Sequence, residues 1–192
     1  MTARTHDLAA ITALGVVVLL HPFGTISPST AIIAILANQI GGITPDIDQP
    51  TAPFWRNLPI TRLFGKFFDN LMGGHRFLTH SVLGLALFGF LSKMLLSFVH
   101  PLMPHTNIGY IWWAFMIGMT SHLVMDSFTK EGVPWLLPIP IKFGFPPLKA
   151  LRVTTGKFAE NWLVLPALAV VDIWLFTSHY PQILLLLHQR II

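Results

Sequence analysis

Cysteine is missing from this 192-residue sequence, and charged side chains are scarce, at 10% of the residues. An ordinary soluble domain carries roughly 25% charged residues. The absence of cysteine excludes disulfides, zinc-thiolate sites, iron–sulfur clusters and cysteine nucleophiles, so any metal must be held by His, Asp or Glu. The shortage of charge, beside 53% hydrophobic residues, argues against a free soluble domain.

Apolar residues are concentrated in five blocks separated by short polar stretches, which is typical of a membrane-spanning chain. The last three blocks contain 20, 18 and 19 residues, within the roughly 17–25 that cross a hydrocarbon core of about 30 Å. The first two form either short spans or a re-entrant hairpin, because His21-Pro22 interrupts one and the other has only 15 residues. We therefore predict an all-α transmembrane bundle of about five spans, built as a single membrane-embedded unit over residues 1–192. The blocks are Leu8–Ile26, Ser29–Ile43, His80–Val99, Ile108–Met125 and Trp162–Tyr180.

Basic residues lie mainly on one side of the predicted bundle. With the N-terminus inside, ten of the twelve Lys and Arg residues fall in the inner segments 1–7, 44–79 and 126–161. This asymmetry follows the positive-inside rule, which predicts a multi-pass protein of the inner (plasma) membrane with a cytoplasmic N-terminus. It also accounts for the net charge of +4 without a nucleic-acid partner, and none is expected.

Two inner segments have the composition of membrane-surface structure. The segment from Asn57 to Met72 has the apolar spacing of an amphipathic helix, which either lies on the membrane or packs against the spans. Between Val133 and Ala150, five prolines exclude a regular helix. The apolar residues among those prolines indicate a loop at the membrane surface on the cytoplasmic side.

The residues that can bind a metal lie at the inner ends of the blocks. A single residue of this kind would be interpreted as a solvated interfacial group or a helix cap. Because these residues all lie on the same side of the predicted bundle, we expect them to form one site in a compact bundle. His122 and Asp126, spaced i, i+4, share a helix face, and Asp46 and Asp48 project together if the backbone after Pro45 is extended. Imidazole and carboxylate groups would hold one or two divalent ions of Zn, Mn or Fe. The predicted metal ligands are His6, Asp46, Asp48, His75, His80, His122 and Asp126.

Other polar residues near these ligands are assigned supporting roles. Glu160 is either a further ligand or the general base, and Arg76 and Lys130 would neutralise charge developing on a phosphoryl oxygen. Thr79 and Ser81 would orient the imidazoles. A serine hydrolase is a poorer fit, because the sequence has no GxSxG motif.

Three inner motifs, together with a few isolated residues, resemble a known family. The motifs are PDID at 45–48, HRFLTHS at 75–81 and HLVMDSFT at 122–129, with Gly132, Thr5-His6, Thr155-Gly156 and Glu160 outside them. In combination they resemble the YdjM/YbcI family of inner-membrane metal-dependent hydrolases, some members of which carry a LexA-binding label. The resemblance covers nearly the whole chain and implies a multi-span protein with metal-dependent hydrolase activity.

The predicted function is a membrane-bound metal-dependent hydrolase that acts at the cytoplasmic face. Metal-activated water would cleave a phosphoester or related ester of a lipid-like, anionic substrate, and membrane lipids and a cytosolic protein are further expected partners. The alternative is a non-enzymatic membrane protein, either a metal- or proton-coupled transporter or an adaptor for a cytosolic partner. A transporter places polar groups near the membrane midplane, where Lys93, Asp172 and Asn38 keep this alternative open.

Overall fold

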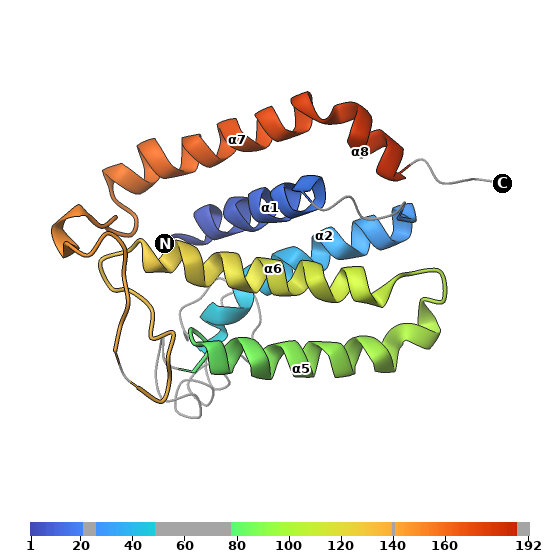
Figure 1. Ribbon diagram of the computed structural model, residues 1–192, viewed down its shortest axis with the longest axis horizontal. Coiled ribbons are helices and arrows are strands. Elements are labelled where there is room, and N and C mark those ends of the chain that lie inside the picture. Colours follow the sequence, from blue (N-terminus) through green and yellow to red (C-terminus); the bar gives the residue numbers. More distant parts are fainter. Residues whose placement is uncertain (21–25, 49–77, 140, 188–192) are drawn as a thin grey trace, which may run out of the picture.

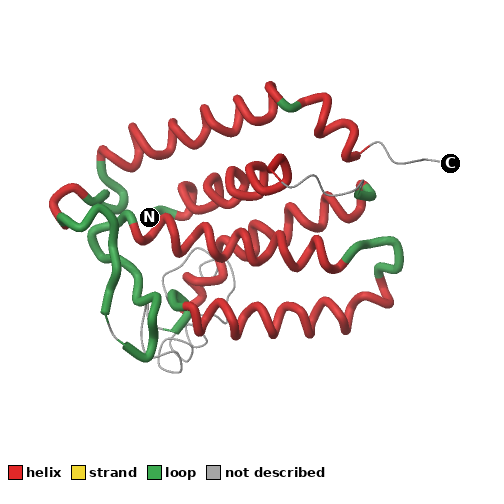
Figure 2. The backbone as a smooth tube through the Cα atoms, in the orientation of Figure 1, coloured by secondary structure: helices red, strands yellow, loops and turns green. Residues whose placement is uncertain are grey.

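The computed structural model describes residues 1–20, 26–48, 78–139 and 141–187 of the chain. The described residues form helices and connecting loops (Figure 2). They contain two isolated β-bridges but no sheet. Five helical segments are long and apolar enough to cross a membrane. The prediction of an all-α bundle with about five spans is therefore confirmed.

The helical elements follow the predicted blocks. The five candidate spans are Ala3–Leu20, Pro28–Ile47, Val82–Leu102, Ile108–Ser127 and Glu160–Ser178. Their component elements are α1 (Ala3–Leu20), α2 (Pro28–Ile43), the 3₁₀ turn η1 (Thr44–Asp48), α5 (Val82–Val99), the 3₁₀ turn η2 (His100–Leu102), α6 (Ile108–Ser127), the π-helical turn η4 (Glu160–Val164) and α7 (Leu165–Ser178). Two further elements are the 3₁₀ turn η3 (Lys149–Leu151) and the terminal helix α8 (Tyr180–Leu187).

Helix α6 forms the centre of the bundle. It packs against α1, α2 and α5, whereas α7 packs mainly on α1 (Figure 1). Accordingly, 44% of the α6 span is buried, against 11% of the span that contains α5 and 6% of the span that contains α7. The two flanking helices therefore present most of their apolar surface outward, as helices facing lipid do.

Glycines allow the backbones of α2 and α6 to approach closely. A Cβ on Gly41 would overlap the carbonyl oxygen of Phe115, and a Cβ on Gly118 would overlap the carbonyl oxygen of Asn38. The amide of Asn38 crosses the same contact and donates to the Ala114 carbonyl at 3.1 Å. Small residues and interhelical hydrogen bonds are the usual means of helix association in membranes. Helices α2 and α6 are thus in direct backbone contact at these glycines.

We expect Gly118→Ala to lower the free energy of unfolding by about 3 kcal/mol, because the added methyl overpacks a backbone contact that has no room to yield. Gly15→Ala is the matched control, since its Cβ would meet only Leu175 Cδ1 at 3.5 Å, an ordinary contact distance. Denaturation of both variants in detergent micelles tests the difference. Equal losses of stability would contradict the tight α2–α6 contact.

The first two spans and the terminal helix differ from the prediction. The first two candidate spans have 18 and 20 residues, long enough to cross the membrane, which favours two spans over a re-entrant hairpin. Helix α8 was not predicted, because Pro181 follows Tyr180 and suggests a break; a proline in the first turn of a helix is nevertheless tolerated.

The two predicted membrane-surface segments have different outcomes. The segment from Val133 to Ala150 is a loop, as predicted, closed by backbone hydrogen bonds between Val133 and Phe143; its one helical element is the start of the short turn η3. The predicted amphipathic segment from Asn57 to Met72 lies outside the described residues.

Candidate metal centre

Five of the predicted ligands meet at one end of the bundle. His6 lies in the first turn of α1, Asp46 on η1, His80 two residues before α5, and His122 and Asp126 in the last two turns of α6. We call these five residues the His/Asp cluster. The end of the bundle that holds them, called the site end below, also carries the loop between α6 and η4 (Figure 1).

Two imidazole nitrogens of the cluster each lie close to the same two carboxylate oxygens. His80 Nε2 lies 3.8 Å from Asp46 Oδ1 and 3.7 Å from Asp126 Oδ2. His122 Nε2 lies 3.6 Å from Asp46 Oδ1 and 3.9 Å from Asp126 Oδ2. These separations exceed an N–H···O hydrogen bond of about 2.7–3.2 Å. They are close to the roughly 3.4 Å between ligand atoms of a tetrahedral ion with bonds of about 2.1 Å.

His6 extends the cluster on the other side of Asp126. Its Nε2 lies 3.2 Å from Asp126 Oδ1, and its ring stacks on that of His122 with centroids 3.6 Å apart. Asp126 thus directs Oδ1 toward His6 and Oδ2 toward His80 and His122; Oδ1 also contacts the amino nitrogen of Met1. Two overlapping groups result, one of His6, His122 and Asp126 and one of Asp46, His80 and His122. The donor set is therefore compatible with either one or two ions.

Hydrogen bonds from neighbouring residues fix the imidazole orientations. His122 Nδ1–H donates to the Gly42 carbonyl at 2.6 Å, which leaves the Nε2 lone pair directed into the cluster. Among the described residues, this buried Nε2 has no hydrogen-bond partner. His80 Nδ1 lies 2.9 Å from Thr79 Oγ1. Metal-binding histidines are typically held in this way through their second nitrogen, so the residues fit a metal ion.

Thr79 and Ser81 have different roles, although both were predicted to orient imidazoles. The contact between Thr79 and His80 agrees with the prediction. The Ser81 hydroxyl instead accepts from the Gly84 N–H at 3.0 Å and donates to the Leu78 carbonyl at 2.7 Å. Ser81 is therefore the N-cap of α5, a role that serine often takes before an apolar helix.

The cluster is buried except at Asp46. His6, His80, His122 and Asp126 are at most 1% exposed. The Asp46 side chain is 22% exposed. Burying several ionisable groups beside apolar spans is costly unless they are compensated by one another or by a bound ion. Among the described cluster residues, Asp46 is thus the one with appreciable solvent exposure.

Glu160 lies outside both groups of candidate ligands. Its Oε1 accepts hydrogen bonds from the Thr2 N–H at 2.5 Å, the Thr2 hydroxyl at 2.8 Å and the Thr5 hydroxyl at 2.7 Å. Its Oε2 accepts from the Gly156 N–H at 2.6 Å. The buried carboxylate therefore joins the start of the last span to the beginning of α1, beside His6. Its role as a base stays a prediction.

The condition under which Asp46 and Asp48 would project together, an extended backbone after Pro45, is not met. The residues after Pro45 form the 3₁₀ turn η1 instead of an extended strand. Helix α2 runs directly into η1. The Thr44 hydroxyl donates to the Ile40 carbonyl at 2.7 Å, and the Thr44 N–H donates to the Ile40 and Gly41 carbonyls. Proline is tolerated in a first turn, where its missing N–H is not needed.

Of the remaining predicted residues, the structure describes the side chain of Lys130. Lys130 is exposed in the loop that follows α6, so its predicted role is untested. His75, Arg76 and the Asp48 side chain lie outside the described residues.

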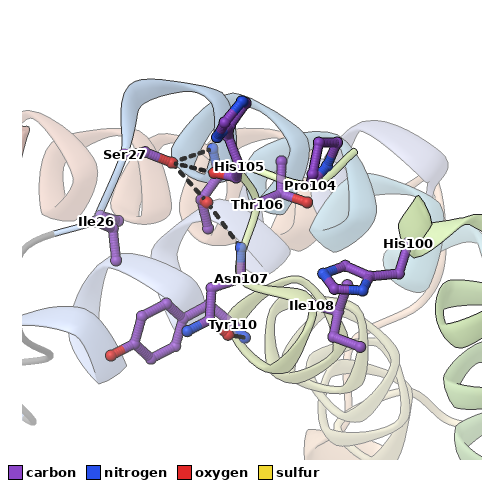
Figure 3. A pocket seen from close by; sticks show the side chains of 10 residues that line it. Ile26, Ser27, His100, Pro104, His105, Thr106, Asn107, Ile108 and Tyr110 are labelled. Carbon is purple, nitrogen blue, oxygen red and sulfur yellow. Dashed lines mark hydrogen bonds between the residues drawn. The ribbon is translucent and has the colours of Figure 1, made fainter. Parts of the chain in front are cut away.

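A second polar cavity lies at the opposite end of the bundle. Its volume is about 500 Å³, and Figure 3 shows His100 and His105 on different sides of it. Ser27 and Thr30 line it at the start of α2, the far end of that helix from Asp46. No carboxylate is among the described residues that line it.

The mid-span polar residues do not form a continuous path. Lys93 Nζ on α5 lies 5.7 Å from the ring centroid of Trp112. Asn38 is engaged in the α2–α6 contact. Asp172 is on α7, which flanks the bundle on the side away from α5 (Figure 1). The arrangement does not favour the transporter alternative.

Comparison with known proteins places the chain in a family. A family model described as YdjM inner membrane protein matches residues 1–183. The uncharacterized protein YvsG of Bacillus subtilis (strain 168) is 28% identical over 176 residues, which cover 92% of this chain and 94% of YvsG. The inner membrane protein YdjM of Escherichia coli (strain K12) is 30% identical over 139 residues, which cover 69% of this chain and 61% of that protein. No solved structure matches. The chain is therefore a membrane protein that belongs to the YdjM inner membrane protein family.

Proposed function

We propose that the chain is a membrane-bound metal-dependent hydrolase whose His/Asp cluster holds one or two divalent cations. The observation that carries the proposal is that each of two imidazole nitrogens, His80 Nε2 and His122 Nε2, lies 3.6–3.9 Å from the same two carboxylate oxygens. The donor types match Zn, Mn and non-haem Fe.

The chain positions its ligands for catalysis. When bound, a divalent cation supplies Lewis-acid chemistry, because it lowers the pKa of coordinated water toward neutrality and polarises the scissile group. The Gly42 carbonyl and Thr79 hold the His122 and His80 rings, and the partly exposed Asp46 marks the open side of the site. Arg76 and Lys130 are proposed to neutralise the substrate charge, and Glu160 is retained as a candidate base.

The loop between Val133 and Ala150 supports a lipid-like substrate. Trp135 connects this loop to the site: its carbonyl accepts from the Val82 N–H at 3.0 Å, and its indole N–H donates to the Ser127 hydroxyl at 2.9 Å. Exposed Lys142 and Lys149 suit an anionic headgroup or an anionic membrane surface. The exposed apolar side chains of the loop are Leu136, Ile139, Ile141, Phe143, Phe145 and Leu148.

We expect the purified chain, supplied with Zn²⁺ or Mn²⁺, to hydrolyse an amphiphilic phosphoester in micelles at least about tenfold faster, in kcat/KM, than its short soluble analogue, because the spans concentrate lipid at the site. His122→Ala should abolish both activities. His105→Ala, at the opposite end of the bundle, is the matched control. Wild-type activity that survives in His122→Ala would refute the assignment of the site.

The orientation of the chain is a second part of the proposal. The absence of cysteine allows single-cysteine labelling without a background, with Lys149→Cys at the site end and Thr106→Cys at the opposite end. We expect a membrane-impermeant maleimide added outside intact cells to label Thr106→Cys and to reach Lys149→Cys only after permeabilisation. The reverse pattern would place the cluster outside the cytoplasm.

A further inference from the structure

An apolar groove runs along the seam between α1 and α6. It has a volume of about 460 Å³ and is lined by α1 from Ala9 to Val17, by α6 from Trp113 to Met125, and by Leu168 of α7. We infer that this groove binds one acyl chain of a lipid whose headgroup lies at the His/Asp cluster. The inference rests on the proposed function and names its substrate class, a membrane lipid phosphoester.

One end of the groove adjoins the cluster. Ala9 follows His6 by three residues and therefore lies near the same helix face. Ser121 and Met125 line the groove and are the sequence neighbours of His122 and Asp126. A chain lying in the groove would thus carry its polar end to the metal ligands.

The length of the groove matches one membrane leaflet. Met125 and Trp113 are twelve residues apart on α6, about 18 Å along the helix axis. One leaflet of the hydrocarbon core is about 15 Å thick. The groove therefore runs along the membrane normal for the depth of a single acyl chain that starts at the site end.

The walls are suited to hydrocarbon although they contain hydroxyl groups. The Thr12 hydroxyl donates to the Leu8 carbonyl at 2.9 Å, and the Ser121 hydroxyl donates to the Gly118 carbonyl at 2.8 Å. Both hydroxyls bond within their own helices, as is common for Ser and Thr in membrane helices. Thr12 also bonds to the carboxylate of Asp172 on α7, which lies outside the groove lining.

The cross-section favours a lipid chain over a helix of a second copy. Dividing the volume of about 460 Å³ by the groove length of about 18 Å gives a mean cross-sectional area of a few tens of Å². A helix about 10 Å across has a cross-sectional area of roughly 80 Å². Helix α7, which packs on α1, closes one side of the groove through Leu168.

Photo-crosslinking tests the occupant directly. The full chain is reconstituted in phosphatidylcholine vesicles containing phosphatidylglycerol with a diazirine near the end of one acyl chain. We expect labelling to concentrate at Val17, Trp113 and Met116, and to fall at least fivefold in Ala13→Phe, which fills the groove. Ala31→Phe is the matched control, because Ala31 lines a neighbouring apolar groove of about 280 Å³ that shares Trp113 and Ile117 but not Val17 or Met116, so labelling at Val17 and Met116 should be unchanged in this variant. Equal labelling of the groove and of the exposed α5 residues Phe90 and Met94 would overturn the inference.

Kinetics separate this inference from the proposed function. In Ala13→Phe, KM for a micellar phosphoester should rise about tenfold, while metal content and hydrolysis of bis(4-nitrophenyl) phosphate stay unchanged. Thr120→Phe, on the opposing wall, is the second variant if Ala13→Phe does not fold. A wild-type chain that hydrolyses neither substrate refutes the proposed function, and the crosslinking result still decides the inference. Unchanged KM in a folded variant, or a disulfide-linked dimer formed through Ala13→Cys, would overturn it.

Discussion

The double variant His80→Ala, Asp126→Ala is expected to keep less than about a tenth of the Zn, Mn or Fe that the wild-type chain retains after purification without chelator. The two substitutions remove one residue from each of the two groups of candidate ligands, and Asp126 is also the carboxylate that faces His6. Protein metal sites usually need three or four protein ligands, and losing even an outer hydrogen bond to a ligand costs about 10–100-fold in affinity. Inductively coupled plasma mass spectrometry gives the metal content per chain.

A matched control variant tests whether the loss of a histidine elsewhere lowers the metal content. His105→Ala, in the cavity at the opposite end, should retain the wild-type metal content. Added metal should also stabilise the wild-type chain, by about 2.7 kcal/mol when the free ion is at 100 times its Kd, and should leave the double variant unchanged. Full metal content in a folded double variant would show that the His/Asp cluster is not the site.

The spans could be predicted because the signal is local. A run of about 20 apolar residues is visible without knowing what it packs against. The residues at which the spans begin and end were harder to predict from hydropathy. Helix α1 starts at Ala3, five residues before the predicted block, because the polar Thr5, His6 and Asp7 belong to its first turns. Hydropathy assigns such polar residues to a loop. They are helical here because they lie beside the His/Asp cluster at the membrane boundary.

Five of the seven predicted ligands lie together in the described part of the chain, but their geometry was only partly predictable. The i, i+4 spacing of His122 and Asp126 fixes a shared helix face, and the structure places both in the cluster. The sidedness of the spans brought in His6, Asp46 and His80. The carbonyl of Gly42 could not be predicted as the partner of His122, because the two residues meet only through the packing of α2 on α6. Gly41 and Gly42 suggested a close approach, but the sequence does not indicate which carbonyl becomes accessible.

Glu160 illustrates the same limit, since its sequence position at the start of a span was equally consistent with a ligand and with a base. Its four hydrogen-bond donors come from Thr2, Thr5 and Gly156, and the first two lie more than 150 residues away in the sequence. No local pattern identifies such partners. The structure therefore suggests that Glu160 holds α1, and with it His6, against the last span.

We accordingly expect Glu160→Ala to lower the free energy of unfolding by about 3 kcal/mol, because it leaves two backbone N–H groups and two hydroxyls without their acceptor. Each buried, unsatisfied donor costs about 1–3 kcal/mol, and the hydroxyls recover part of that cost by rotating. Metal content should stay near the wild-type value, since Glu160 belongs to neither group of candidate ligands. Denaturation in detergent and metal analysis of the same preparation measure both quantities, with the exposed Glu131→Ala as control.

Glu160→Gln then separates anchoring from catalysis. The amide keeps one oxygen as an acceptor for the donors that meet Oε1, but its NH₂ group faces the Gly156 N–H, so stability should fall less than in Glu160→Ala. An amide cannot accept a proton as a general base does, and a loss of about 100-fold or more in kcat with metal and fold retained would therefore assign the base to Glu160. Turnover that falls only in proportion to stability would assign it to anchoring. Loss of metal in Glu160→Ala at undiminished stability would contradict both readings, because it would make Glu160 a ligand.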